Sequence, residues 1–143
     1  MALWKMPPKA KVYEALTAVA DGRVKLLTEN SAEVSSSGGD KVYKVTWNWD
    51  RDEISSSDPA SRFQGYVGYP IIAVLLSTGR LEYDSLLAQK LGGVAWKEIN
   101  DRFKRDYDAA VRHVLAERKI GPELDTLVDR LYSQIEDMKL LRP

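Results

Sequence analysis

The side chains that could do chemistry gather between residues 55 and 70. Ser55–Ser57 precede Asp58, and Ser61 follows shortly after, a set that could include a nucleophile or hold a phosphate. The chain has a single histidine, His113, in a distant helical pattern, and it has no Gly-x-x-x-x-Gly-Lys-Ser/Thr segment. No acid, base and nucleophile can be assembled from these types, so a hydrogen-bonding turn explains the serines better than catalysis.

A glycine-rich loop, Gly65–Pro70, runs directly into an apolar segment at residues 71–76. Pro70 suits the first turn of a helix, and the free N–H groups at a helix start attract anions. Arg62 is close enough in sequence to assist. A tight turn that needs glycine is the alternative interpretation, but we expect this loop, with Tyr66 and Tyr69, to face a ligand.

An aromatic strand precedes these polar residues. From Lys41 to Trp49 the aromatic positions alternate with polar ones, the period of a half-buried strand. Tyr43, Trp47 and Trp49 could stack single-stranded nucleic acid, flanked by Lys41 and Lys44. The same face could instead pack against helices, and burial of so much apolar area favours that reading. The candidate nucleic-acid or ligand-binding residues are Lys41, Lys44, Arg62, Tyr66 and Tyr69.

Composition excludes several chemistries. The 143 residues contain no cysteine and one histidine, so thiolate metal sites, disulfides, cysteine nucleophiles and histidine pairs are excluded. Lys plus Arg and Asp plus Glu number 21 each, so any binding to nucleic acid must come from a local patch. We expect no metal, no cofactor and no enzymatic activity.

The elements that must position these residues follow an α+β pattern. We expect an N-terminal helix, a three- to four-stranded antiparallel meander, an apolar helix and a helical C-terminal extension. The division falls near residue 82, giving an α+β unit at 1–82 and an extension at 83–143 that packs on it or mediates association. The expected helices span about 9–20, 71–76, 84–91, 95–119 and 122–141, and the expected strands about 23–28, 32–37, 41–49 and 53–57.

The last predicted helix carries an apolar stripe with near-heptad spacing. About two heptads are present, fewer than a coiled coil needs. Packing against the preceding long helix is one interpretation, and self-association or binding of a partner, including a homodimer, is the other. The candidate association face consists of Leu124, Val128, Leu131, Ile135 and Met138.

The stretch from Gly22 to Leu76 resembles a SWIM-type zinc-binding module that has lost its zinc. Ser55–Ser57 stand where that family has Cys-x-Cys, and Gly68–Pro70 stand where it has Cys-x-His before an apolar helix. All four ligands are missing, so the resemblance implies no metal here. Modules of this kind bind nucleic acid or other proteins, and this is the function that the resemblance implies.

These patterns together predict a binding protein. The leading hypothesis is a non-catalytic module for nucleic acid or for a nucleic-acid-processing protein. The alternative is an assembly adaptor that self-associates through its C-terminal helices without nucleic acid. The start of the chain lacks the features of a signal peptide and no apolar run can span a bilayer, so we expect a cytoplasmic protein without membrane contact. High charge content with few Asn and Gln is typical of a thermophilic source.

Overall fold

A computed structural model describes residues 2–143 and confirms the α+β fold. Six helices and a six-stranded sheet form the framework. The helices are α1 (Ala10–Ala20), α2 (Tyr69–Ser77), α3 (Ser85–Gln89), α4 (Trp96–Arg102), α5 (Tyr107–Glu117) and α6 (Glu123–Met138). The strands are β1 (Ala2–Leu3), β2 (Val24–Thr28), β3 (Ser31–Ser35), β4 (Val42–Asn48), β5 (Glu53–Ser56) and β6 (Leu141–Arg142). Two short turns, the 3₁₀ helix η1 (Trp49–Arg51) and the π-helix η2 (Ala60–Gln64), flank β5.

The predicted meander is present as β2–β3–β4–β5, and every neighbouring pair in it is antiparallel. The two ends of the chain extend this sheet, because β6 lies beside β5 and β1 lies beside β6, in the order β1-β6-β5-β4-β3-β2. The β5–β6 pair is parallel, which makes the sheet mixed. Strands of two residues carry no readable alternation, so the sequence did not predict β1 and β6.

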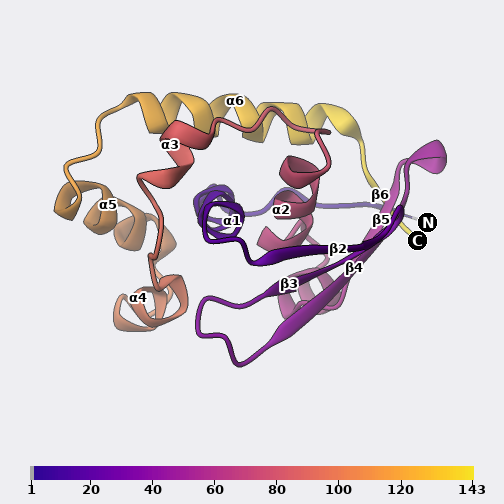
Figure 1. The fold of residues 1–143 in the computed structure, drawn as a ribbon, viewed down its shortest axis with the longest axis horizontal. Coiled ribbons are helices and arrows are strands. Elements are labelled where there is room, and N and C mark those ends of the chain that lie inside the picture. The colour runs from indigo at the N-terminus through magenta and orange to yellow at the C-terminus, as the bar shows by residue number, and fades with distance from the viewer. Residues whose placement is uncertain (1) are drawn as a thin grey trace.

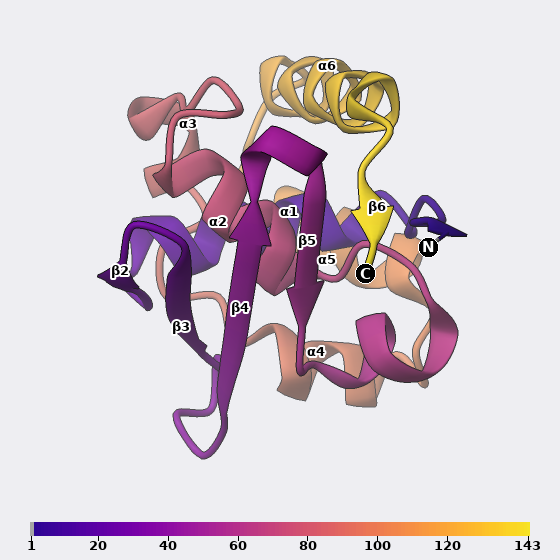
Figure 2. The ribbon, with the colours of Figure 1, turned by 90° about the vertical axis from the view of Figure 1, so that its right-hand side faces the viewer.

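The helices cover one face of the sheet, and the other face is open (Figures 1 and 2). On β4 the side chains of Val45 and Trp47 are buried against the helices, whereas Lys44 and Thr46 are exposed on the open face. Trp47 stacks on Trp49 with ring centroids 5.4 Å apart. The aromatic strand therefore packs mainly into the core. Helix α2 is apolar on all sides because it lies between α1 and the sheet.

The prediction of one long helix at 95–119 is wrong. Two helices, α4 and α5, occupy this range, and the chain breaks between them at Phe103–Asp106. Lys104 and Arg105 both have left-handed backbone, with φ of 54° and 64°. The Asp106 side chain then accepts a hydrogen bond from Ala109 N at 3.1 Å and caps α5. No glycine or proline marks this break, so the continuous apolar pattern concealed it.

The C-terminal helices pack on the unit formed by residues 2–82. Helix α6 contacts α1, and its end leads into β6 within the shared sheet. Four side chains of the candidate association face are buried in the protein's own core: Leu124, Val128, Leu131 and Ile135. The fifth, Met138, is partly buried and packs against this core. Among the helices of residues 2–143, none combines the length and the apolar character that crossing a membrane requires.

Candidate functional site

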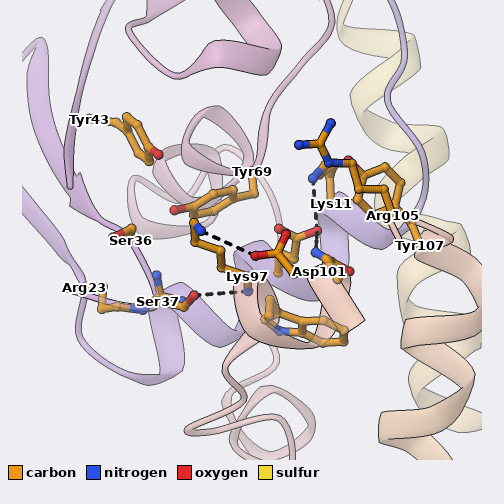
Figure 3. Close-up of a pocket in the computed structure, with 13 residues that line it drawn as sticks. Lys11, Arg23, Ser36, Ser37, Tyr43, Tyr69, Lys97, Asp101, Arg105 and Tyr107 are labelled. Atoms are coloured by element: carbon orange, nitrogen blue, oxygen red, sulfur yellow. Dashed lines mark hydrogen bonds and ion pairs between the residues drawn. The ribbon is translucent and has the colours of Figure 1, made fainter. Parts of the chain in front are cut away.

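A cleft lies where α1, the β3–β4 hairpin and the α4–α5 segment meet (Figure 3). It consists of two adjoining hollows of about 200 and 300 Å³, which share Lys11, Tyr43, Tyr69, Arg105 and Tyr107. Tyr66 lines the second hollow, so four tyrosines contribute to the walls. We call this region the tyrosine cleft. Its lining also includes Glu14, Arg23, Trp96, Lys97, Asn100 and Asp101.

The floor of the tyrosine cleft is a buried ion pair. Lys11 Nζ lies 3.2 Å from Glu14 Oε2, and their side chains are 11% and 8% exposed. Asn100 Nδ2 reaches the same Glu14 oxygen at 3.5 Å, and Lys11 Nζ lies 4.4 Å from the centroid of the Tyr107 ring. Burial raises the pKa of Glu14 despite the nearby ammonium group. Burial also opposes the charge on Lys11, but the charge interaction and hydrogen bond with Glu14 help to leave the pKa of Lys11 raised.

Two buried polar atoms in the cleft residues have no hydrogen-bond partner. They are Arg23 Nε, a donor, and Asn100 Oδ1, an acceptor, and they are the only such side-chain atoms within residues 2–143. Arg23 is held by a 2.7 Å bond from Nη1 to Ser35 O, and Asn100 is 8% exposed. Buried polar groups are normally paired, since leaving one unpaired costs about 1–3 kcal/mol. Both atoms are buried, so a ligand in the cleft can pair with them only if their side chains turn toward the hollow.

Arg105 is the exposed cation of the tyrosine cleft. It lines both hollows and takes part in no ion pair within residues 2–143. By contrast, Lys97 is paired with Asp101 at 3.5 Å. The left-handed backbone at Arg105 is costly for a residue with a side chain, and such strain is concentrated at functional sites. Arg105 is therefore the group best placed to meet an anion at the mouth of the cleft.

Hydrogen bonds from α1 and the hairpin fix α4 beside the cleft. The buried Trp96 donates from Nε1 to Thr17 Oγ1 at 2.8 Å, which anchors the start of α4 on α1. The next residue, Lys97, donates its backbone N–H to Ser37 Oγ at 3.4 Å, and this bond joins α4 to the β3–β4 hairpin. The opposing walls of the cleft are thus tied together at one end, as Figure 3 shows.

Three tyrosines of the walls, Tyr43, Tyr66 and Tyr69, are partly buried. Tyr43 and Tyr69 meet edge to face with centroids 6.3 Å apart. Burial is the main cause that raises the pKa of Tyr43, Tyr66 and Tyr69 above the ordinary value of 10.0. Their hydroxyl groups therefore stay protonated across the physiological range and can donate hydrogen bonds, while their rings offer surfaces for stacking.

The serine-rich segment forms a buried cluster beside the second hollow, which Asp58 also lines. We call it the Asp58 cluster. Asp58 Oδ1 accepts from Ser56 Oγ at 2.5 Å and from Ser61 Oγ at 2.8 Å, and Asp58 Oδ2 accepts from Ser61 N at 3.1 Å. Gly68 N donates to Ser61 Oγ at 3.3 Å, so the cluster ties the end of β5 to the start of α2. Glycine is needed at 68, because a Cβ there would lie 2.3 Å from Asp58 Oδ2.

The structure divides the residues that the sequence singled out. Tyr66 and Tyr69 line the tyrosine cleft, whereas Lys41, Lys44 and Arg62 are exposed outside its lining. Lys44 lies on the open face of the sheet. No group of three or more His, Cys, Asp or Glu residues suited to a metal ion occurs in the described part of the chain.

Sequence reasoning missed most of the cleft. Lys11, Arg23, Arg105 and Tyr107 come from segments far apart in the chain, and no motif links them. One signal was available: Lys11 and Glu14 are three apart on a mainly apolar helix, and this spacing allows an ion pair.

The fold and the cleft define a small α+β protein with a cleft lined by tyrosines and charged side chains. The chain belongs to the family described as "Uncharacterised conserved protein UCP014422", whose model matches residues 4–141. This range contains the whole tyrosine cleft and the Asp58 cluster. No curated protein and no solved structure matches the chain.

Proposed function

We propose that the protein is a non-catalytic module that binds single-stranded nucleic acid in the tyrosine cleft. The observation that carries this proposal is the meeting of four tyrosine rings with the cations Lys11, Arg23 and Arg105 in one cleft. Proteins that bind single strands combine aromatic surfaces for the bases with cations for the backbone. The SWIM-type resemblance of residues 22–76 points to the same class of ligand.

The individual groups suit the parts of a nucleotide. A base entering between the tyrosines gains about 1–3 kcal/mol from stacking. Arg23 Nε and Asn100 Oδ1, the unpartnered donor and acceptor, are buried, and they can pair with the polar edge of a base once their side chains turn toward the hollow. Arg105, exposed and unpaired within residues 2–143, suits a phosphate.

The size of the cleft favours a single strand over a duplex. Hollows of about 200 and 300 Å³ can take an unstacked base but not a double helix. Bases that are splayed out of a strand are the ones that proteins stack on aromatic side chains. We therefore expect the protein to prefer single-stranded to double-stranded nucleic acid of the same sequence.

A fluorescence titration tests the proposal. Trp96 lines the cleft, so its emission should change as a single-stranded oligonucleotide of about eight nucleotides saturates the site. The affinity should fall several-fold between about 50 and 200 mM salt, because few phosphates are neutralised. Arg105→Ala should weaken binding by roughly tenfold at low salt, since a charge-assisted bond contributes about 1.5–3 kcal/mol.

Arg102→Ala is the matched control, because Arg102 is an exposed arginine on α4 that does not line the cleft. It should bind like the wild type. Absence of saturable binding at both salt concentrations would contradict the proposal, as would equal losses in the two variants. Lys41→Ala and Lys44→Ala extend the test to the sequence-predicted lysines. They show whether the bound nucleic acid also contacts the β3–β4 hairpin.

A further inference from the structure

Phe63 is an unusually exposed aromatic residue. Its side chain is 79% exposed, and it lies on the π-helix η2, between Arg62 and Gln64. A phenylalanine in water gains nothing for the fold, since its hydrophobic contribution requires burial. Short π-helical segments are rare and are frequently found at functional sites. Both properties make Phe63 a candidate contact for a partner.

The turn that carries Phe63 is held firmly from both sides. Below it, Asp58 accepts from the backbone and the hydroxyl of Ser61. Arg142 of β6 donates from Nη2 to Arg62 O at 2.9 Å, which fixes the middle of the turn. Gly65 then closes η2 with left-handed backbone, and its carbonyl accepts from Lys5 N at 3.0 Å. The exposed ring is therefore presented by an anchored segment.

The same turn is continuous with the tyrosine cleft. Pro59, Ala60 and Gln64, which flank Phe63 on this segment, line the second hollow together with Tyr66. One cation lies at the ring itself: the Arg62 guanidinium is 5.6 Å from the centroid of Phe63. A second, Arg142, is bonded to the same turn. An aromatic surface with adjacent arginines, at the end of a cleft of the same character, matches the charge and stacking pattern of a nucleic-acid strand.

We propose that a single strand bound in the tyrosine cleft leaves it across η2 and stacks a neighbouring base on Phe63, with Arg62 beside its phosphate. This inference rests on the proposed function and extends it from a one-base pocket to a site for several nucleotides. It assigns a role to Arg62, which lies outside the cleft lining. It also predicts that affinity rises with length until the strand reaches Phe63.

The experiment compares oligonucleotides of about two and about eight nucleotides on the wild type and on Phe63→Ala. The variant should bind the longer strand roughly tenfold more weakly, because one stacked base is lost, and should bind the shorter strand as the wild type does. Phe63→Tyr should restore the binding of the longer strand, since it keeps a ring for stacking. Leu86→Ala is the control, because Leu86 is also 79% exposed but lies on α3, outside the cleft lining.

The outcomes separate the two proposals. If the wild type binds both lengths and Phe63→Ala binds the longer strand as well as the wild type does, the Phe63 proposal is overturned. The proposal that the tyrosine cleft binds nucleic acid then still stands. Equal losses for both lengths overturn it too, because the ring would then act through the cleft or the fold. If the wild type binds neither length, the proposed function fails, and the path over η2 fails with it.

Discussion

The tyrosine cleft and the Asp58 cluster both contain buried polar groups beside the same apolar core. They differ in how many of these groups have hydrogen-bond partners. Asp58 is 3% exposed, and both of its carboxylate oxygens accept hydrogen bonds from Ser56 or Ser61. In the cleft, Arg23 Nε and Asn100 Oδ1 have no partner within residues 2–143. Asp58 also lines the second hollow, so the two regions adjoin, and what distinguishes them is that the carboxylate of Asp58 is fully paired.

Under the proposed function, this difference separates a structural role from a binding role. A buried polar group that is fully paired stabilises one conformation, and its removal leaves the partners unpaired. A group without a partner gives up stability that a ligand can restore. Substitutions in the Asp58 cluster should therefore act on folding, and those in the cleft should act on binding.

The largest effect should come from the Asp58 cluster. Asp58→Ala should lower the free energy of unfolding by about 3 kcal/mol, because it leaves Ser56, Ser61 and the start of α2 without their shared acceptor. Urea unfolding followed by tryptophan fluorescence measures this. Asp137→Ala, at an exposed aspartate on α6, is the control and should change stability by less than about 0.5 kcal/mol. If Asp58→Ala lowered the free energy of unfolding by less than about 1 kcal/mol, the structural role of the Asp58 cluster would be contradicted.

A second paired cluster should show a smaller effect that depends on pH. Asp125 accepts from Arg112 Nη2 at 2.7 Å, from Arg112 Nη1 at 3.0 Å and from the Tyr13 hydroxyl, so it joins α6 to α5 and α1. The bonds from Arg112, followed by that from Tyr13, outweigh burial and lower the pKa of Asp125 below its usual 3.8. A depressed carboxyl pKa stabilises the fold above the unfolded value, and this stabilisation is lost as the pH falls through the folded pKa.

We therefore expect Asp125→Asn to cost about 1 kcal/mol at neutral pH, a modest value because Arg112 is half exposed to solvent. The difference from the wild type should stay constant above roughly pH 5 and should shrink below roughly pH 4. Urea unfolding at both ends of this range checks it. A difference that persisted unchanged at the acidic end would show that the ion pair is not its source.

The smallest stability effect should come from the strained loop of the cleft, and it should have the opposite sign. Arg105→Gly should raise the free energy of unfolding by roughly 0.5 kcal/mol, because glycine accepts the left-handed backbone without strain. It should also weaken binding, since the exposed cation is lost. Lys104→Gly is the matched control: it has φ of 54° but does not line the cleft, so it should gain stability and keep its affinity. If Arg105→Gly bound nucleic acid with the affinity of the wild type, Arg105 would not be part of the binding site.

The sequence predicted those parts of the fold that repeat a local pattern. Alternation of Tyr43, Val45 and Trp47 revealed β4, and short connections predicted the antiparallel meander around it. The break at Phe103–Asp106 was missed, because the apolar spacing continues across it and left-handed backbone at Lys104 and Arg105 leaves no trace in residue type.

The sequence predicted only those residues of the candidate site that lie close together in the chain. Tyr66 and Tyr69 stand beside glycine and proline in a loop that the sequence marks, and both line the cleft. Lys11, Arg23 and Arg105 meet them only through the packing of α1, β2 and the α4–α5 loop, which no local spacing encodes. The SWIM-type resemblance of residues 22–76 stays a prediction. It places Ser55–Ser57 and Gly68–Pro70 at the ligand positions, and the Asp58 cluster joins those two segments with hydrogen bonds.

The most direct test of the central claim is to observe the two unpartnered groups during binding. Nuclear magnetic resonance can follow the side-chain Nε–H of Arg23 and the side-chain amide of Asn100 while a single-stranded oligonucleotide of about eight nucleotides is added. Our account predicts that both signals shift as binding saturates, while the backbone signal of Asp137, on α6 and outside both the cleft and η2, stays in place. Shifts confined to the open face of the sheet around Lys44, with Arg23 and Asn100 unchanged, would contradict it.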